Sequence, residues 1–265
     1  MSKERLDKLV TQRRLIRSRT RAQRMIMAGR VRVDGRTIYR PGHRVRSEAE
    51  LELIPGREYV SRGGKKLAGA LADFRIDPQG AVCLDVGSST GGFTDCLLQN
   101  GAARVHAVDV GTGQLDWGLR NDRGVLVHEG INARYLTMAD IGEEINLATI
   151  DVAFISLRHI LPPLCKILSR NGEIIALVKP QFEAGRDKVE RGGVVTDRAV
   201  HLDVLRKLQA FVEEKTPLRV AAATHSSLTG PAGNIEFFFL LQERLEKKRG
   251  PDLEKLVERA HIGLG

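Results

Sequence analysis

The sequence predicts an α/β protein: a Rossmann-like doubly wound sheet that ends in an antiparallel hairpin, preceded by a small α+β domain. Three observations predict this fold class. Strand and helix patterns alternate from about residue 64 to residue 214, which is typical of a parallel sheet with right-handed crossovers. Two strand-like segments near the C-terminus are joined by only six residues, too few for a crossover. The first 56 residues instead carry two short amphipathic helices and a hairpin signal.

Positive charge is concentrated in the first quarter of the chain. Residues 1–66 hold 19 Lys and Arg against 7 Asp and Glu, whereas the remaining residues hold 23 against 26. The net charge of +9 therefore comes entirely from the N-terminal part. Such asymmetry predicts a basic module that seeks a polyanion, joined to a near-neutral body with another task.

The N-terminal domain is predicted over residues 1–56. Its apolar spacing predicts two helices, the second closing at Gly29, and Asp34-Gly35 predicts a tight hairpin. Guanidinium groups suit phosphate, and the candidate contacts are Arg5, Arg13, Arg14, Arg17, Arg19, Arg21 and Arg24. Helix, arginine belt, "AGRVRVDG" and hairpin, in that order, resemble the RNA-binding domain first seen in the fourth small-subunit ribosomal protein. The resemblance implies that this domain binds RNA.

The main domain is predicted over residues 64–244, after a linker at 57–63. Its strands are predicted near residues 81–86, 104–108, 124–128, 147–155 and 172–179. Its helices are predicted near residues 64–73, 93–100, 157–169 and 196–214, with Thr196 as the cap of the last. Before that helix, the charged, glycine-rich loop at 183–195 is either a mobile segment that closes over substrate or a plain surface loop.

The two last strand segments are "LRVAAATHSSL" and "IEFFFLLQ", separated by "TGPAGN". This short connection requires antiparallel pairing. A doubly wound sheet with such an ending is characteristic of methyltransferases that use S-adenosylmethionine and unusual for nicotinamide dehydrogenases. The charged tail at 245–265 is predicted to be helical and is assigned no function.

A glycine-rich turn follows the first strand of this sheet, between Asp85 and the next helix. Glycines let the backbone approach a ligand closely, and an acid beside the turn favours a ligand with a cationic end, such as an ammonium and a sulfonium. Asp109 ends the second strand, where a carboxylate accepts hydrogen bonds from a ribose diol. The candidate cofactor contacts are Asp85, Gly87, Ser88, Thr90, Gly91, Gly92, Phe93, Asp109, Val110 and, for the adenine, Asn132. An ordinary strand-to-helix turn remains the alternative.

Two further ionisable groups lie at strand ends, namely Lys179 and Glu236; Asp151 interrupts the predicted strand near 147–155, and Lys66 lies near the start of a helix. Parallel strands aim such groups into one crevice at their carboxyl ends. Taken one at a time, each also suits an ordinary surface or structural role. Together they predict a site that handles protons.

The motifs "SRGGKKL", "DVGSSTGGFT", "DVAFISL", "VKPQFE" and "GNIEFF" resemble, in that order, those of the TlyA proteins. These are ribosomal RNA cytidine 2′-O-methyltransferases within the FtsJ-type group. The resemblance implies S-adenosylmethionine as cofactor, ribosomal RNA within ribosomal subunits as partner, and a catalytic tetrad of Lys66, Asp151, Lys179 and Glu236. Two lysines stand where the family often has one, and Lys66 is chosen because it directly precedes Leu67.

The chemistry of ribose methylation explains these residue types. A 2′-hydroxyl must lose its proton and lie in line with the methyl group that it attacks. A lysine accepts that proton only where a neighbouring cation and burial depress its pKa. Lys179 is the candidate base, with Lys66 as the neighbouring cation that also orients the ribose and the two acids fixing the ammonium groups.

Other classes of protein fit the sequence less well. A non-catalytic RNA-binding protein would not need the lysines and acids of the site, and a haemolysin would need membrane-spanning segments that the sequence lacks. The charged N-terminus argues against a signal peptide, so we expect a cytoplasmic protein, and a monomer. Cys83, Cys96 and Cys165 are expected to be core thiols, with neither disulfide nor metal.

Overall fold

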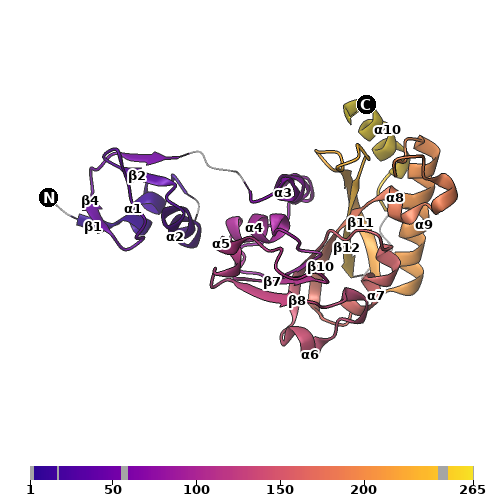
Figure 1. Ribbon diagram of the computed structural model, residues 1–265, viewed down its shortest axis with the longest axis horizontal. Coiled ribbons are helices and arrows are strands. Elements are labelled where there is room, and N and C mark those ends of the chain that lie inside the picture. The colour runs from indigo at the N-terminus through magenta and orange to yellow at the C-terminus, as the bar shows by residue number, and fades with distance from the viewer. Residues whose placement is uncertain (1–2, 17, 55–58, 244–249, 265) are drawn as a thin grey trace. The chain divides into compact units, whose positions relative to one another are not determined.

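A computed structural model describes residues 3–16, 18–54, 59–243 and 250–264 (Figure 1). The chain divides into two compact units. One comprises residues 1–58 with 98–101, and the other comprises residues 59–97 with 102–265.

The N-terminal unit contains two helices and two small sheets. Its elements are β1 (Lys3–Arg5), α1 (Leu6–Gln12), α2 (Arg19–Met27), β2 (Val31–Val33), β3 (Arg36–Thr37), β4 (Arg44–Arg46) and β5 (Leu51–Leu53). Strand β1 pairs with β4, and β2 lies between β3 and β5. The apolar sides of both helices and of β2 form the core of this unit.

The predicted hairpin is confirmed. Asp34 and Gly35 have φ values of 49° and 77°, and Val33 pairs with Arg36 across them. Two successive positive φ values define the turn whose twist matches paired strands. Gly29, with φ 69°, directly follows the cap of α2, so it closes that helix as predicted.

The second unit is built on a seven-stranded sheet in the order β11-β12-β10-β9-β6-β7-β8. The strands are β6 (Val82–Val86), β7 (Arg104–Asp109), β8 (Val125–Glu129), β9 (Ile145–Ile150), β10 (Leu168–Val178), β11 (Leu218–His225) and β12 (Phe237–Glu243). The five strands β6 to β10 run parallel, and β12 inserts antiparallel between β10 and β11. The predicted α/β class and terminal antiparallel hairpin are therefore confirmed.

Helices flank this sheet. The α-helices are α3 (Arg62–Phe74), α4 (Gly92–Gln99), α5 (Trp117–Arg120), α6 (Met138–Ile141), α7 (Leu161–Leu164), α8 (Pro180–Glu183), α9 (Arg198–Lys215) and α10 (Leu253–Leu264). Short 3₁₀ turns are η1 (Ala133–Tyr135), η2 (Leu157–His159) and η3 (Arg186–Lys188).

Three predicted boundaries were wrong. The helix predicted near 157–169 is only η2 and α7, because Pro162 and Pro163 have no N–H to donate and β10 begins at Leu168. The strand predicted near 147–155 ends at Ile150, which leaves Asp151 just beyond it. The cap of α9 is Asp197, whose side chain accepts from the backbone N of Ala199, rather than Thr196.

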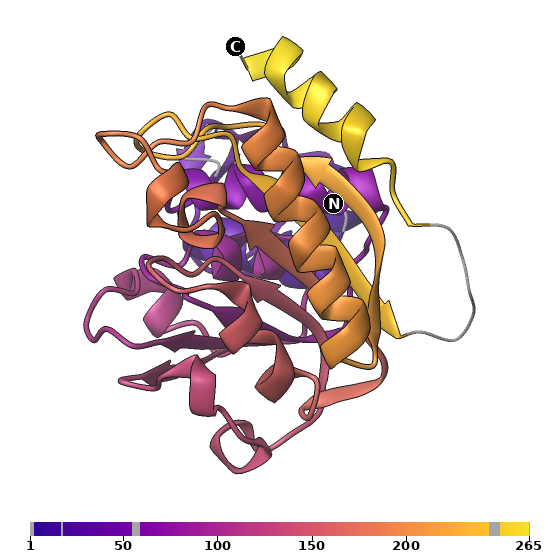
Figure 2. The same cartoon turned by 90° about the vertical axis from the view of Figure 1, so that its right-hand side faces the viewer.

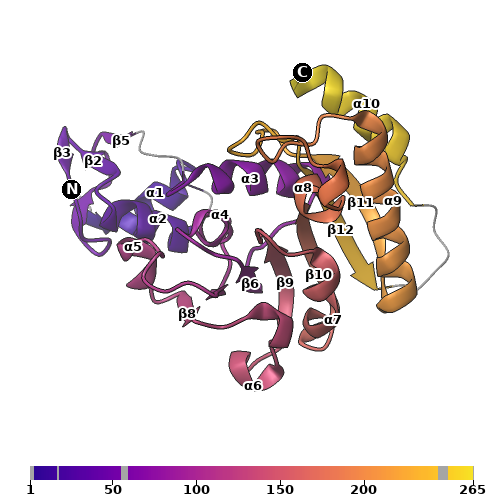
Figure 3. The ribbon, with the colours of Figure 1, turned by 45° about the vertical axis from the view of Figure 1, so that its right-hand side comes forward.

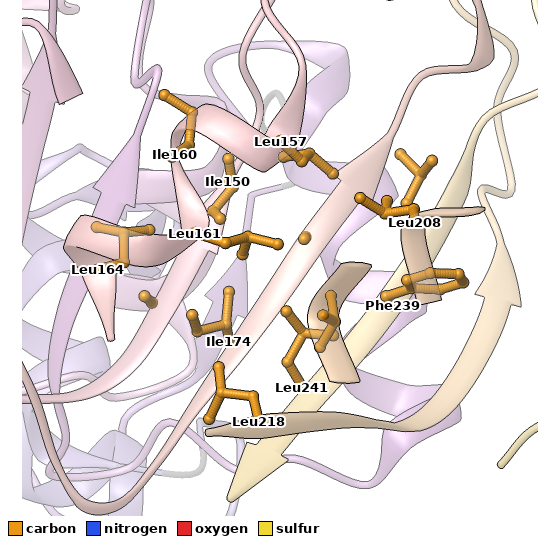
Figure 4. Close-up of a cluster of buried hydrophobic side chains, with 14 of the residues drawn as sticks. Ile150, Leu157, Ile160, Leu161, Leu164, Ile174, Leu208, Leu218, Phe239 and Leu241 are labelled. Carbon is orange, nitrogen blue, oxygen red and sulfur yellow. The ribbon is translucent and has the colours of Figure 1, made fainter. Parts of the chain in front are cut away.

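Alternate residues of the central strands face two apolar layers. On one face, Ile150, Ile174 and Phe239 pack against η2, α7 and α9 (Figure 4). On the other, Phe238 of β12 contacts Phe93 of α4, with 6.2 Å between ring centroids. Helices α3 and α9 lie on opposite sides of β10 and β12 (Figure 3).

Helix α10 is part of this core. Leu253, Leu256, Val257 and Ala260 are buried in the same cluster as α9 and β11. Figure 2 shows α10, in yellow, beside the long helix α9, in orange. The C-terminal segment predicted as a helical tail is therefore packed against the sheet domain over the part that the structure describes.

Candidate active site

A cavity of about 470 Å³ lies at the carboxyl ends of the parallel strands. Its walls come from the start of α3, the turn after β6, the ends of β9 and β10, and the turn before β12. The lining residues are Ser61, Arg62, Gly63, Lys66, Gly87, Ser88, Ser89, Thr90, Gly92, Phe93, Asp151, Ala153, Lys179, Thr229, Pro231 and Glu236. All four residues of the predicted tetrad therefore meet in one cavity.

The tetrad forms two lysine–carboxylate pairs. Lys66 Nζ donates a hydrogen bond to Glu236 Oε2 at 2.5 Å, and both side chains are buried. Lys179 Nζ lies 2.6 Å from Asp151 Oδ1, and these side chains are 15% and 25% exposed. The second pair is close but lacks hydrogen-bond alignment, since Asp151 Oδ1 accepts no hydrogen bond among the described residues. Lys66 is thus the more firmly held of the two ammonium groups.

Sheet topology explains this meeting. Asp151 and Lys179 each follow the last residue of adjacent parallel strands, β9 and β10. Glu236 precedes an antiparallel strand, whose first residue, Phe237, pairs with Val178. The beginning of β12 therefore lies at the same sheet edge as the end of β10.

Burial and charge set the protonation of the site. Burial raises the pKa of Glu236 above its usual value, and this rise is opposed by the ammonium groups of Lys66 and Lys179. The Asp151 carboxylate adds to the rise. The other three members of the tetrad thus all act electrostatically on Glu236.

Lys66, rather than its neighbour Lys65, faces the cavity. Lys66 is 7% exposed, whereas Lys65 is exposed and does not line the cavity. Helix α3 is amphipathic, and Lys66 lies on the same buried side as Leu67 and Ala70. The choice between two adjacent lysines is thus made by the face of the helix.

The turn after β6 packs closely against neighbouring segments because of its glycines. Gly87 has φ +81°, and a Cβ there would lie 2.5 Å from the carbonyl oxygen of Asp151. A Cβ at Gly92 would clash with Ser61 Oγ. Both backbone approaches exclude any larger residue, so the turn can lie directly against α3 and the end of β9.

Asp85 does not face the cavity, contrary to the expectation that it would meet a cationic ligand directly. Its carboxylate is fully buried and accepts hydrogen bonds from Thr94 N at 2.8 Å, Thr94 Oγ1 at 2.7 Å and Thr149 Oγ1 at 3.3 Å. Burial, together with the nearby Asp151 charge, raises the pKa of Asp85 to about 7. In this structure Asp85 holds the first turn of α4 against the sheet.

The predicted adenosine contacts lie at neighbouring strand ends, outside the cavity lining. Asp109 accepts hydrogen bonds from the backbone N of Ser89 and of Gly111, each at 2.7 Å. Val110 is 72% exposed, and Asn132 is exposed and caps η1 through Arg134 N. Gly91 also does not line the cavity, because it packs against Leu115 and Leu119. The segments that carry Asp109 and Asn132 are joined by a hydrogen bond from Ile131 N to Asp109 O at 3.1 Å.

Sequence reasoning missed Phe154. Its side chain is 91% exposed. Its backbone is in the left-handed region, with φ 62°, which is unfavourable for a residue with a Cβ. The ring contacts that of Phe182 at 5.0 Å between centroids, and Lys179 Nζ lies 6.0 Å from the Phe182 ring centre. An exposed large apolar residue in a strained conformation beside an active site signals a binding role.

Two positioning side chains were also missed. Glu183 accepts hydrogen bonds from Ser156 Oγ and Leu157 N, both at 2.7 Å, and so ties α8, which follows Lys179, to the segment that follows Asp151. Asn234 is 2% exposed, accepts from Val195 N and donates to Gly193 O, each at 2.9 Å. No spacing rule singles out such residues, because their partners are distant in the sequence.

The candidate RNA-contacting arginines are not equivalent. Arg5 and Arg19 both bond to Asp7, and Arg13 donates to the backbone carbonyls of Ala49 and Ser47. Arg14 is exposed with φ 58°, while Arg21 and Arg24 lie half-buried on α2. Arg17 lies outside the described residues.

Sheet topology and cavity together define a methyltransferase of the Rossmann-like class. The FtsJ-like methyltransferase family model matches residues 59–243, and the S4 domain model matches residues 4–51. The chain belongs to the FtsJ-like methyltransferase family, which confirms the resemblance seen in its motifs.

Several known proteins are similar to this chain over almost its whole length. The putative rRNA methyltransferase YqxC of Bacillus subtilis is 45% identical over 98% of this chain and 94% of its own length. The 16S/23S rRNA (cytidine-2′-O)-methyltransferase TlyA of Mycobacterium tuberculosis is 43% identical over 97% of this chain and 96% of its own. A solved structure titled putative hemolysin, from Streptococcus thermophilus, is 41% identical with a TM-score of 0.74, covering 99% of this chain and 97% of that one.

Within the described ranges, no helix is long and apolar enough to cross a bilayer. The same residues contain no group of three or more His, Cys, Asp or Glu side chains arranged to hold a metal ion.

Proposed function

We propose that the protein methylates a ribose 2′-hydroxyl of ribosomal RNA, that of a cytidine, with S-adenosylmethionine as the methyl donor. The convergence of Lys66, Asp151, Lys179 and Glu236 in one cavity carries this proposal. Support for the substrate comes from the relatives, since the M. tuberculosis protein is named for 2′-O-methylation of cytidine in ribosomal RNA.

The residues at the glycine turn fit the proposed cofactor. Gly87 and Gly92 line the cavity and let the turn pack closely against Asp151 and Ser61, and the cavity volume is within the range of small-molecule sites. The cavity side of the turn would hold the amino-acid end, and Asp109, Val110 and Asn132 would hold the adenosine. S-adenosylmethionine supplies an electrophilic methyl group on its sulfonium.

The tetrad supplies the proton chemistry. The role of base, which accepts the proton of the 2′-hydroxyl, is assigned to Lys179, because Lys66 is held by a hydrogen bond to buried Glu236 whereas Lys179 makes no aligned hydrogen bond to Asp151. Asp151 then stabilises the new ammonium charge at 2.6 Å. The Lys66–Glu236 pair keeps a fixed cation in the cavity wall, which orients the attacking oxygen.

The RNA is bound by both units in this proposal. The basic N-terminal unit, residues 1–56, supplies phosphate contacts, and the part at 64–244 supplies the transfer, joined by 57–63. Within the predicted 245–265 segment, helix α10 (Leu253–Leu264) supports the transfer unit, since it packs in its core. Phe154, exposed beside Lys179, offers a ring on which an unstacked base can lie. We further propose a monomer that acts on ribosomal subunits in the cytoplasm.

One experiment tests the proposal. The pure protein is incubated with ribosomal subunits that lack 2′-O-methylation and with methyl-labelled S-adenosylmethionine, and the label is mapped by mass spectrometry. We expect label on a ribose 2′-oxygen of a cytidine, its loss in Lys179→Ala, and its retention in the exposed matched control Lys65→Ala. No transfer to either subunit by a protein that binds both RNA and cofactor would exclude this function for these substrates.

A further inference from the structure

The N-terminal unit contains one fully buried carboxylate, that of Asp7, among the residues that the structure describes there. It accepts four hydrogen bonds: Arg5 Nε at 3.1 Å, Arg5 Nη2 at 3.0 Å, Arg19 Nε at 3.0 Å and Gln23 Nε2 at 2.8 Å. The Arg5 contact is the largest cause that holds the pKa of Asp7 well below its usual range. Asp7 therefore stays ionised and joins side chains from three segments.

The two arginines that Asp7 holds still face solvent. Their side chains are 47% and 54% exposed, while that of Asp7 is 0% exposed. A guanidinium has five N–H donors. Arg19 bonds to Asp7 through Nε alone and Arg5 through Nε and Nη2, so each keeps terminal N–H groups for a ligand. Two cations against one carboxylate also leave the cluster positive.

Backbone contacts fix the position of Asp7 itself. Its N–H donates to Pro41 O at 3.0 Å, the N–H of Leu6 donates to His43 O at 2.8 Å, and Thr11 Oγ1 donates to Asp7 O at 2.8 Å. The carboxylate is thus anchored to the 41–43 turn and to α1 before it meets either arginine. Arg5, at the end of β1, and Arg19, at the start of α2, are both oriented from this single point.

Other arginines of the unit are held differently. Arg32 pairs with Glu52 and Arg46 with Asp34, and both acids are about half exposed. Surface pairs of this kind fix side chains only weakly. Arg13 donates from both terminal nitrogens to the carbonyls of Ala49 and Ser47. Arg5 and Arg19 thus differ from these three arginines, because they combine a buried carboxylate anchor with outward donors.

We propose that Asp7 is a positioning residue that holds Arg5 and Arg19 as one preorganised clamp for a phosphate of the RNA backbone. This rests on the proposed function, because it assumes that the N-terminal unit binds RNA. An arginine already fixed by a buried carboxylate loses less side-chain freedom when it bonds bidentately to a phosphate. An acidic residue thereby increases the affinity of a basic surface for a polyanion.

The test removes a negative charge and asks whether RNA binding becomes weaker, which is opposite to the effect that net charge alone predicts. Binding of the full chain to unmethylated ribosomal subunits, used as the probe, is measured with Asp7→Asn and with the control Asp34→Asn. Both variants remove one negative charge from the same unit, so general electrostatics predicts tighter binding for both. We expect Asp7→Asn to weaken binding about 5- to 10-fold, as for one lost charge-assisted contact, and Asp34→Asn to leave it equal or tighter.

A double-mutant cycle separates positioning from a purely structural role. In a chain that carries Arg5→Ala and Arg19→Ala, we expect Asp7→Asn to have no further effect on binding. An equal loss in both backgrounds, or tighter binding by Asp7→Asn alone, would overturn the proposal.

A second variant covers the case in which Asp7→Asn fails to fold. Arg19→Lys keeps the charge and can still reach Asp7 but loses the fork, and we expect the same weakening. Unchanged binding by Arg19→Lys would contradict the clamp. If the wild-type chain binds no ribosomal subunit, the proposed function fails rather than the role of Asp7.

Discussion

Lys66 and Glu236 are 170 residues apart in the chain, yet Lys66 Nζ lies 2.5 Å from Glu236 Oε2 inside the core of the catalytic unit. The lysine comes from the first turns of α3 and the glutamate from the residue before β12. Each charge is buried only because the other is present, since an isolated buried charge is far more costly than a pair.

Removing one member of this pair should cost stability as well as activity. We expect Glu236→Gln to lower the free energy of unfolding by about 3 kcal/mol, because it leaves the Lys66 ammonium buried without its counter-charge. The double variant Lys66→Met with Glu236→Leu should recover most of that stability but no methyl transfer. Urea unfolding and transfer assays on the same samples measure both. Full activity in the double variant would show that the pair has no part in the chemistry.

Substitution of Phe154 should weaken the use of the RNA substrate and leave cofactor binding unchanged. We expect Phe154→Ala to lower kcat/KM for ribosomal subunits about 10-fold, as for one lost base stack of about 1–3 kcal/mol, with unchanged affinity for S-adenosylmethionine. Phe154→Tyr should retain activity. The exposed Ile262, on α10, is the matched control, and Ile262→Ala should be neutral.

The strained backbone at Phe154 makes protein stability a second test of whether its ring binds substrate or packs in the fold. Phe154→Gly should be as impaired in transfer as the alanine variant, yet it should not be less stable than wild type, because glycine relieves a left-handed strain of about 1–2 kcal/mol. Thermal unfolding checks this. A loss of stability in Phe154→Gly equal to that of a core truncation would mean that the ring packs rather than binds.

Asn234 should position the turn that carries Glu236. Asn234→Ala removes the two hydrogen bonds to the 193–195 segment, and we expect a loss of about 1–3 kcal/mol in unfolding free energy. It should also lower kcat more than it changes KM, because Thr229, Pro231 and Glu236 line the cavity from the same turn. Asn146→Ala, an asparagine distant from the cavity lining, is the control. Equal effects on kcat in both variants would rule out a local role.

The free energy of unfolding should decrease at acid pH because His201 becomes protonated. This ring is buried, with its nitrogens 2.9 Å from His261 Nε2 and 3.0 Å from Val195 O, and burial lowers its pKa to about 4. A lowered folded-state pKa means that the stabilisation is complete above the unfolded value of 6.5 and is lost as the pH falls toward 4. The loss amounts to at most about 3 kcal/mol.

The measurement is thermal unfolding at pH 7.5 and pH 4.5 for wild type and His201→Gln. We expect a smaller pH dependence in the variant. The raised pKa of Asp85 acts in the opposite direction, since it favours the folded state at low pH, so only the difference between the two chains isolates His201. Identical pH dependence would contradict this assignment.

Much of the architecture could be predicted because it follows from local chemistry. The Asp34-Gly35 hairpin needs two positive φ values, which these residue types tolerate, and the short "TGPAGN" connection permits only antiparallel pairing. The predictions failed where packing competes with local pattern. The helix expected near 157–169 was lost to two prolines and to an early start of β10, and the acid expected to face the cofactor, Asp85, is instead buried beneath Thr94.

By itself, the sequence determined the alternation of strands and helices, the terminal antiparallel hairpin and the basic character of the N-terminal unit, because periodicity, turn chemistry and charge are local properties of a chain. The tetrad was assigned from motifs that resemble those of a known family. Only the tertiary structure decided that Lys66 pairs with Glu236, that Phe154 is exposed near Lys179 through Phe182, and that Asp7 orients two arginines. These relationships depend on which face of each element is covered and on partners distant in sequence. Packing alone brings them within contact distance.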